Sequence, residues 1–243
     1  MTDNAPPVRA PLRARDLARA ELVAEIIRSA RDQLAAHGAA ALSLRAVARD
    51  LGMASSALYR YFSSRDALLT ALIIESYEAL ADACEQAHAE ADPDDHLERW
   101  RRIAHAVRDW ARANPHEYAL IYGSPVPGYE APQDTIDPAA RIPFLLLALL
   151  ADVAAAGSDA FVAGDVDVPA MLSAQVALLS SEGAAAVDDR LALAGVGAWA
   201  LLFGMVNFEL FGQFVNSFDD ADALFAYQVD STAERLGLGP VSG

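Results

Sequence analysis

The chain has 243 residues, 54% of them hydrophobic, which is enough to bury a substantial core in one large domain or in two. The net charge of −16 argues against simple nucleic-acid binding, but the charge is unevenly distributed. Residues 1–70 hold ten arginines against seven acidic residues, whereas residues 71–243 hold eight arginines against 27 acidic residues. The first part of the chain is therefore compatible with phosphate contact. Cys84 is the only cysteine, which excludes an internal disulfide framework and predicts a reducing, cytoplasmic location.

The first segment, residues 1–18, contains three prolines and three arginines and predicts an arm that is disordered when free. Such an arm either enters a minor groove or is a solvated tail, and we favour the tail. Residues 19–37 predict the first helix. Its apolar residues recur at helical spacing, and Gly38 follows as a helix end.

Residues 43–65 predict a helix-turn-helix. Leu44 opens an apolar stripe on the first helix, and Ser43 precedes it, where a hydroxyl can cap free backbone N–H groups. Gly52 is expected to end this helix. Residues 55–62 predict a second helix that turns Leu58 inward. Its remaining side chains are small, hydroxylated, aromatic or cationic, so we expect this second helix to read a major groove.

This stretch resembles the DNA-binding segment of the TetR family of transcriptional repressors. The matching residues are Ser43, Val47-Ala48, Gly52-Met53-Ala54, Leu58-Tyr59-Arg60-Tyr61-Phe62 and Arg65-Asp66-Ala67-Leu68. Two positions depart from the family pattern: Ala54 replaces a serine, so Ser55 is the expected substitute cap, and Tyr61 replaces a frequent histidine. The resemblance implies DNA contacts by Ser43, Arg45, Ser55, Ser56, Tyr59, Tyr61 and Arg65, and Arg60 joins this set because it is a cationic residue of the same second helix.

The rest of the chain predicts further helices. Ser63 and Ser64 precede a helix that continues to about residue 90, and in the TetR family this helix connects head and body. After a break at 91–95, helices are expected up to Asn114, over 115–122, from Asp137 to 156, over 169–181 and over 220–236. Loops rich in glycine, proline or polar residues are expected at 123–132 and 157–168.

Residues 191–208 contain no charged side chain and reach the length of a membrane span. Their flanks are mainly acidic and Asn207 would lie inside the span, so we favour a helix that is buried centrally and against a partner chain. An operator read as two half-sites requires a two-fold protein. We therefore expect a homodimer through the helices near 190–215 and 220–236.

The second half resembles the WHG type of TetR-family ligand-binding domain. The resemblance lies in Tyr118 with residues 121–129, IYGSPVPGY, and in Trp199 with Phe203 and Gly204. Phe203 stands where that type usually has histidine, which implies a more apolar pocket. We expect a small hydrophobic or aromatic effector to bind among side chains that are bulky, or singly polar on apolar helices, although helical spacing also fits plain core packing. These candidates are Trp100, Trp110, Tyr118, Tyr122, Met171, Gln175, Trp199, Phe203 and Asn207.

Other chemistries have little support in the sequence. His105, Asp109 and His116 lie along one helix and its end, but paired cysteines and an HExxH motif are absent, so no metal site and no cofactor is expected. GxSxG, GxGxxG and P-loop motifs are also absent, so we do not expect an enzyme.

Together these features predict an all-α protein of about nine to ten helices, in which a three-helix helix-turn-helix head precedes a larger helical ligand-binding and dimerisation domain. The expected division is a flexible arm (1–18), a DNA-binding domain with its connecting helix (19–84) and an effector-binding and dimerisation domain (85–243). We expect a ligand-responsive repressor that binds a palindromic operator on double-stranded DNA, is released by its effector and does not bind a membrane. The alternative is a helical small-molecule-binding or interaction protein without DNA activity.

Overall fold

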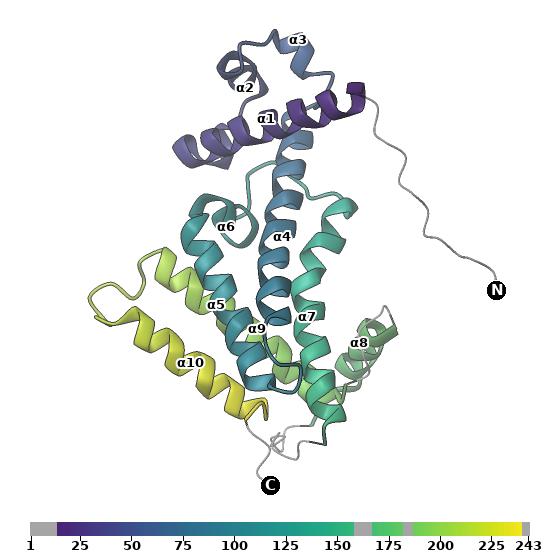
Figure 1. The fold of residues 1–243 in the computed structure, drawn as a ribbon, viewed down its shortest axis with the longest axis vertical. Coiled ribbons are helices and arrows are strands. Elements are labelled where there is room, and N and C mark those ends of the chain that lie inside the picture. Colours follow the sequence, from purple (N-terminus) through teal and green to yellow (C-terminus); the bar gives the residue numbers. More distant parts are fainter. Residues whose placement is uncertain (1–13, 158–166, 182–186, 240–243) are drawn as a thin grey trace, which may run out of the picture. The chain divides into compact units, whose positions relative to one another are not determined.

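The computed structural model describes residues 14–157, 167–181 and 187–239, and within these ranges it contains ten α-helices and no strand (Figure 1). Most of the predicted arm, residues 1–13, and most of the predicted loop at 157–168 lie outside the described residues. The chain forms two compact units that divide between Leu72 and Ile73. The division falls inside one continuous helix, α4 (Arg65–Ala89).

The first unit contains α1 (Ala14–His37), a 3-10 turn η1 (Ala39–Ala41), α2 (Leu44–Asp50), α3 (Ser55–Leu58) and the start of α4. α1 packs on α2, and α2 packs on α3. The core side chains come from one face of each helix: Ile26, Ile27, Ala30, Leu34, Leu44, Val47, Ala48, Leu58, Leu68 and Leu69. A buried glutamine, Gln33 on α1, joins the two ends of α2, because its amide donates to Asp50 Oδ2 at 2.9 Å and accepts from the Ser43 backbone N–H at 3.5 Å.

The turn between α2 and α3 follows the predicted geometry. Gly52 has a φ of 65°, a left-handed conformation that glycine adopts without steric cost. The Met53 N–H then donates to the carbonyl of Ala48 at 2.8 Å, which closes the end of α2. The chain can therefore reverse within a few residues and bring α3 across α2.

Two local expectations in this unit are wrong. Neither α2 nor α3 receives a side-chain capping bond, so neither Ser43 nor Ser55 acts as a cap, and Ala54 holds the N-cap position of α3. α3 also ends at Leu58 instead of at residue 62, since the N–H groups of Arg60 and Tyr61 donate to carbonyls three residues back. This tightening of the last turn redirects the chain toward α4.

The second unit is a helical bundle built around α9. Its elements are the remainder of α4, α5 (His96–Ala113), α6 (Pro115–Tyr122), η2 (Gln133–Thr135), α7 (Ile136–Ala155), α8 (Ala170–Ser181), α9 (Asp189–Leu210) and α10 (Ala221–Arg235). α9 packs against α5, α6, α7, α8 and α10 (Figure 1). The predicted ends of α5 and α6 are confirmed, and Asp220 caps α10 by accepting from the Ala223 N–H at 2.8 Å.

Two helical segments, Gln133–Ala155 and Asp189–Leu210, are long and apolar enough to span a membrane by length and composition. α9, however, places Leu202, Phe203 and Val206 in the core of the second unit. Its apolar character is therefore explained at least in part by burial within the bundle, as expected for a central helix.

One buried arginine, Arg99, and one partly exposed arginine, Arg141, join helices of the second unit. Arg99 on α5 donates to His88 Nε2 on α4 at 2.9 Å and to Asp152 on α7 at 2.6 Å. Arg141 on α7 contacts two carboxylates of α4, Asp82 at 2.6 Å and Glu85 at 2.7 Å. These bonds fix the second half of α4 against α5 and α7.

Candidate nucleic-acid interface and small-molecule pocket

The predicted DNA-contacting side chains lie on the surface of the first unit. Arg45, Ser56, Tyr59 and Arg60 are exposed, and Tyr59 retains 47% of its accessible surface. Ser43, Ser55, Tyr61 and Arg65 are partly exposed. Leu58, between them, is fully buried. The helix-turn-helix thus turns its apolar residues inward and presents hydroxyl, aromatic and cationic groups outward, which is the arrangement that contact with a duplex needs.

Two of these residues also serve the unit itself. The Arg65 guanidinium donates to the Ala39 carbonyl at 2.9 Å and pairs with Asp66 at 3.2 Å, so it holds η1 against the start of α4. The Tyr61 ring lies beneath the guanidinium of Arg19 on α1, with 5.0 Å from the carbon to the ring centroid. The sequence had not singled out Arg19, because it is separated from Tyr61 by more than forty residues.

Five of the predicted ligand-contacting residues meet in the second unit. The rings of Tyr118, Tyr122 and Phe203 lie against one another, with centroids 4.4 to 6.3 Å apart, and Trp199 packs edge-on to Phe203 at 6.0 Å. Asn207 donates to the Phe203 carbonyl at 2.9 Å. This group is called the aromatic cluster below.

Burial governs the chemistry of the aromatic cluster. Tyr118 is inaccessible to solvent and donates to the Phe203 carbonyl at 3.3 Å. Burial raises the pKa of both Tyr118 and Tyr122 well above the ordinary value, so both phenols stay neutral. The Trp199 Nε1 atom is buried and has no hydrogen-bond acceptor within the described part of the chain.

The other four candidates lie elsewhere. Trp100 is 2% exposed and donates to the Val229 carbonyl at 2.9 Å, which makes it a link between α5 and α10, and the two cavities beside it hold only about 10 Å³ each. Trp110 is half-buried at the edge of the core. Met171 is 74% exposed and Gln175 is exposed on α8, so the structure does not bring them to the aromatic cluster.

An open pocket of about 540 Å³ lies next to the aromatic cluster. Its lining comes from four segments and contains no charged side chain: Ile73, Tyr77, Leu120, Ile121, Pro125, Val126, Tyr129, Ala131, Thr135, Ile136, Ala139 and Ala140. Tyr77 connects the two sites, because it lines the pocket, its hydroxyl donates to the Ile121 carbonyl at 3.2 Å and its ring packs edge-on to Tyr122 at 5.8 Å. Sequence reasoning missed this pocket as a site, although it had singled out residues 121–129.

Two of the three hydroxyl groups on the pocket wall donate to carbonyls of the protein. Tyr77 donates to Ile121, and Thr135 Oγ1 donates to the Pro132 carbonyl at 2.7 Å. The wall is therefore suited to apolar surface and offers little to a charged group.

The structure does not support a metal site at His105, Asp109 and His116. His105 packs edge-on to Phe225 with centroids 5.5 Å apart. Within the ranges that the structure describes, no group of three or more His, Cys, Asp or Glu side chains is placed to hold a metal ion.

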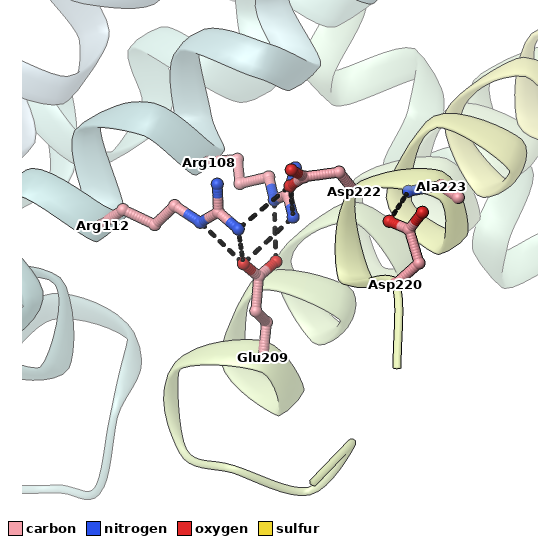
Figure 2. A network of polar contacts seen from close by, with 6 residues as sticks. All are labelled: Arg108, Arg112, Glu209, Asp220, Asp222 and Ala223. Atoms are coloured by element: carbon pink, nitrogen blue, oxygen red, sulfur yellow. Dashed lines mark hydrogen bonds and ion pairs between the residues drawn. The ribbon is translucent and has the colours of Figure 1, made fainter. Parts of the chain in front are cut away.

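A network of ion pairs joins α5 to the C-terminal end of α9 and to the first turn of α10 (Figure 2). Arg108, 4% exposed, contacts both oxygens of Glu209 at 2.8 and 3.1 Å and Asp222 at 2.7 Å. Arg112 approaches the same two carboxylates at 2.6 and 3.1 Å. Two arginines therefore face two carboxylates. Arg108 and Glu209 are largely shielded from solvent, whereas Arg112 and Asp222 lie at the surface. Together these four side chains fix the α9–α10 connection to the bundle.

Comparison with known proteins decides the family. The model of bacterial regulatory proteins of the tetR family matches residues 26–72, and that of the tetracyclin repressor-like C-terminal domain matches residues 100–232. The chain belongs to the TetR family. It is a helix-turn-helix transcriptional regulator, a DNA-binding protein of a non-enzymatic family.

Relatives of this TetR-family regulator support the assignment along most of its length. HTH-type transcriptional regulators of Mycobacterium tuberculosis and Mycobacterium bovis are 43% identical to it over 81% of this chain and 84% of theirs. The crystal structure of the regulatory protein SCO4313 has 36% identity and a TM-score of 0.70, covering 92% of this chain and 98% of that one. The TetR-family regulator PfmR from Thermus thermophilus, 21% identical over 85% of this chain and 96% of its own with a TM-score of 0.55, shows the same fold.

Proposed function

We propose that this regulator binds a palindromic operator as a homodimer in the cytoplasm, represses transcription there and is released by a small hydrophobic effector. The observation that carries the proposal is the pairing of two features in one chain: an outward-facing helix-turn-helix with cationic and aromatic side chains, and a 540 Å³ pocket without charge in the second unit. Release would follow only to the extent that the effector binds one conformer more tightly than the other.

DNA recognition is assigned to Ser43, Arg45, Ser55, Ser56, Tyr59, Arg60, Tyr61 and Arg65. Arg45 is exposed on the outer side of α2, and Tyr59 and Arg60 are exposed directly after α3. Exposure of an aromatic ring beside a guanidinium has no packing purpose within the unit, which favours contact with DNA over the alternative of a helical interaction module. The free hydroxyls of Ser43 and Ser55, which cap no helix, fit the same role.

The test is binding of fluorescent DNA from beside the protein's own gene. Arg45→Ala should weaken binding about tenfold or more, since a base-edge contact contributes about 1–3 kcal/mol. Arg28→Ala is the matched control, because Arg28 is an exposed arginine on the outer face of α1. Arg28→Ala should bind like the parent, and if Arg45→Ala does so as well, the assignment of Arg45 to the DNA interface is wrong.

The effector is assigned to the open pocket and the adjoining aromatic cluster. The uncharged wall favours a neutral apolar molecule, and the adjoining aromatic cluster holds one buried donor, the Trp199 N–H, that has no acceptor within the described residues. Phe203 keeps this region apolar, and we retain the WHG-type assignment of residues 118–129 and of Trp199, Phe203 and Gly204 as part of the proposal. Trp100, Trp110, Met171 and Gln175 are left with weaker support, because Trp100 has its own acceptor and α8 leaves Met171 and Gln175 exposed.

Pocket binding can be measured with N-phenyl-1-naphthylamine, a neutral apolar dye that fluoresces when it leaves water. Ala140→Trp fills the pocket wall and should abolish most of the fluorescence increase. Ala154→Trp, at an exposed position on the same helix α7, should leave it unchanged. Equal dye binding by both variants would place the effector elsewhere.

The homodimer is assigned to the outer faces of α9 and α10. Val196, Ala200 and Phe208 lie on one exposed stripe of α9, and Tyr227 is exposed on α10. An uncharged exposed stripe on a helix that is otherwise part of the core is typical of a subunit interface. Ala200→Glu should convert the dimer to a monomer in sedimentation experiments at micromolar concentration, whereas Ala148→Glu, exposed on α7, should not. A parent protein that sediments as a monomer would refute the assignment.

A further inference from the structure

Arg19 extends the inward face of α1 beyond the hydrophobic core. The buried stripe of this helix includes Ile27, Ala30 and Leu34, and Val23 precedes it at helical spacing. Arg19 stands one turn before Val23, so its side chain points to the side on which α2 and α3 pack. At that end of the helix Arg19 is exposed, and its guanidinium lies over the ring of Tyr61 at 5.0 Å.

Stacking leaves the binding capacity of this guanidinium unused. Contact with an aromatic ring occupies the flat face of the group, whereas its five N–H donors point outward in the plane. Within the described residues Arg19 has no carboxylate partner. The next arginine toward the N-terminus, Arg15, is exposed one turn away. The site is therefore cationic, oriented and unsatisfied, and a phosphate can accept two of its N–H groups side by side.

We propose that Arg19 is a DNA-positioning residue that contacts a backbone phosphate at the edge of the groove occupied by the reader helix, and that Tyr61 holds its guanidinium in place. The proposal rests on the proposed function, because it takes Tyr61 to face the duplex. The stacked side chain has already lost part of its conformational freedom, so less entropy is lost when the phosphate binds. The interface then runs from α2 and α3 to the beginning of α1.

A phosphate contact has a measurable signature. The logarithm of the binding constant falls with the logarithm of salt concentration by about 0.9 for each phosphate that the protein neutralises. Removing one such contact should lower the slope by about 0.9 and weaken binding about eightfold at 0.1 M salt. Because phosphates carry no sequence information, the loss should be equal on specific and unrelated DNA.

The experiment compares Arg19→Gln with Arg28→Gln on two duplexes of equal length, one from beside the gene and one unrelated. Arg28 is nine residues further along α1, which places it about 180° around the helix, and it is also exposed. Arg19→Gln should lower the salt slope and the affinity on both duplexes. Arg28→Gln should match the parent, and Arg19→Lys should keep the slope because it keeps the charge.

Several outcomes separate this inference from its alternatives. A purely structural role for the Arg19–Tyr61 contact would lower the melting temperature of Arg19→Gln and leave the salt slope unchanged, which would overturn the inference. If the parent does not prefer its own promoter DNA, the proposed operator binding fails, whereas the slope on the unrelated duplex still tests Arg19. If only Arg45→Ala loses affinity, the proposed function stands and the Arg19 inference falls.

Discussion

Replacement of Arg108 by methionine tests whether the network in Figure 2 holds the second unit together. The methionine side chain keeps an apolar stem of similar length and removes the guanidinium, with its charge, its hydrogen bonds and its contact with the Phe225 ring at 4.6 Å. Glu209 is 15% exposed, so it cannot recover full hydration when its buried partner is lost.

The expected cost follows from that geometry. Removing one member of a buried ion pair costs about 3–5 kcal/mol. Here Glu209 keeps Arg112 at 2.6 Å and Asp222 is exposed, so we expect a loss of about 2–3 kcal/mol. For a chain of this size the loss corresponds to a drop of about 5–10 °C in melting temperature. Arg112→Met removes a guanidinium that is 43% exposed and should cost about 0.5–1 kcal/mol.

The assay is thermal and urea unfolding of both variants and the parent at one protein concentration, because dimerisation makes stability depend on concentration. A third variant, Arg108→Met with Glu209→Leu, should recover part of the loss, since it no longer leaves a carboxylate uncompensated. If Arg112→Met costs as much as Arg108→Met, or if the double variant is the least stable, burial does not set the strength of this network.

Three further predictions address other contacts. Burial, and secondly the charge of Arg99, lowers the pKa of His88 below its ordinary value of 6.5. As the pH falls below 6.5, the unfolded chain takes up the proton before the folded chain does, so the free energy of unfolding should decline. His88→Gln should reduce this decline in urea titrations between about pH 7.5 and 5.5. Trp100→Phe removes the bond to the Val229 carbonyl between α5 and α10 and should lower the unfolding free energy by about 1–2 kcal/mol, measured by urea denaturation. Leu58→Ala leaves a cavity at a fully buried site in the first unit and should lower the stability of that unit by about 2–4 kcal/mol. DNA binding should fall while dye binding in the second unit persists. Loss of DNA binding and dye binding together would show that the two units unfold as one.

Local sequence signals were sufficient where a single residue determines the backbone. Gly52 marked the turn between α2 and α3, Pro115 the start of α6 and Asp220 the cap of α10, because each acts within one turn of its own position. The second helix of the motif, predicted to reach residue 62 but ending at Leu58, shows the limit of the same reasoning. Helical spacing of Leu58 and Phe62 persists through the tightened turn after α3, so periodicity alone could not show where the α-helical bonds end.

Features that depend on distant segments were not visible in the sequence. Trp100 was predicted to bind a ligand, but its indole N–H donates to the carbonyl of Val229, 129 positions away in the sequence. The open pocket draws its wall from α4, α6, α7 and the loop between the last two, and none of these segments carries a signal of its own for a cavity. Met171 and Gln175 fitted the composition of a pocket but lie on α8, which buries few of its described side chains.

Cys84 gives the protein an internal reporter of opening. Its side chain is fully buried on α4, and burial raises the pKa of the thiol to about 12, so the reactive thiolate is almost absent from the folded chain at neutral pH. It is also the single cysteine among 243 residues. The rate at which a thiol reagent labels the protein therefore follows the opening of the helices around this residue, and effectors that tighten them can be found by the slowing of one chemical reaction without an introduced tag.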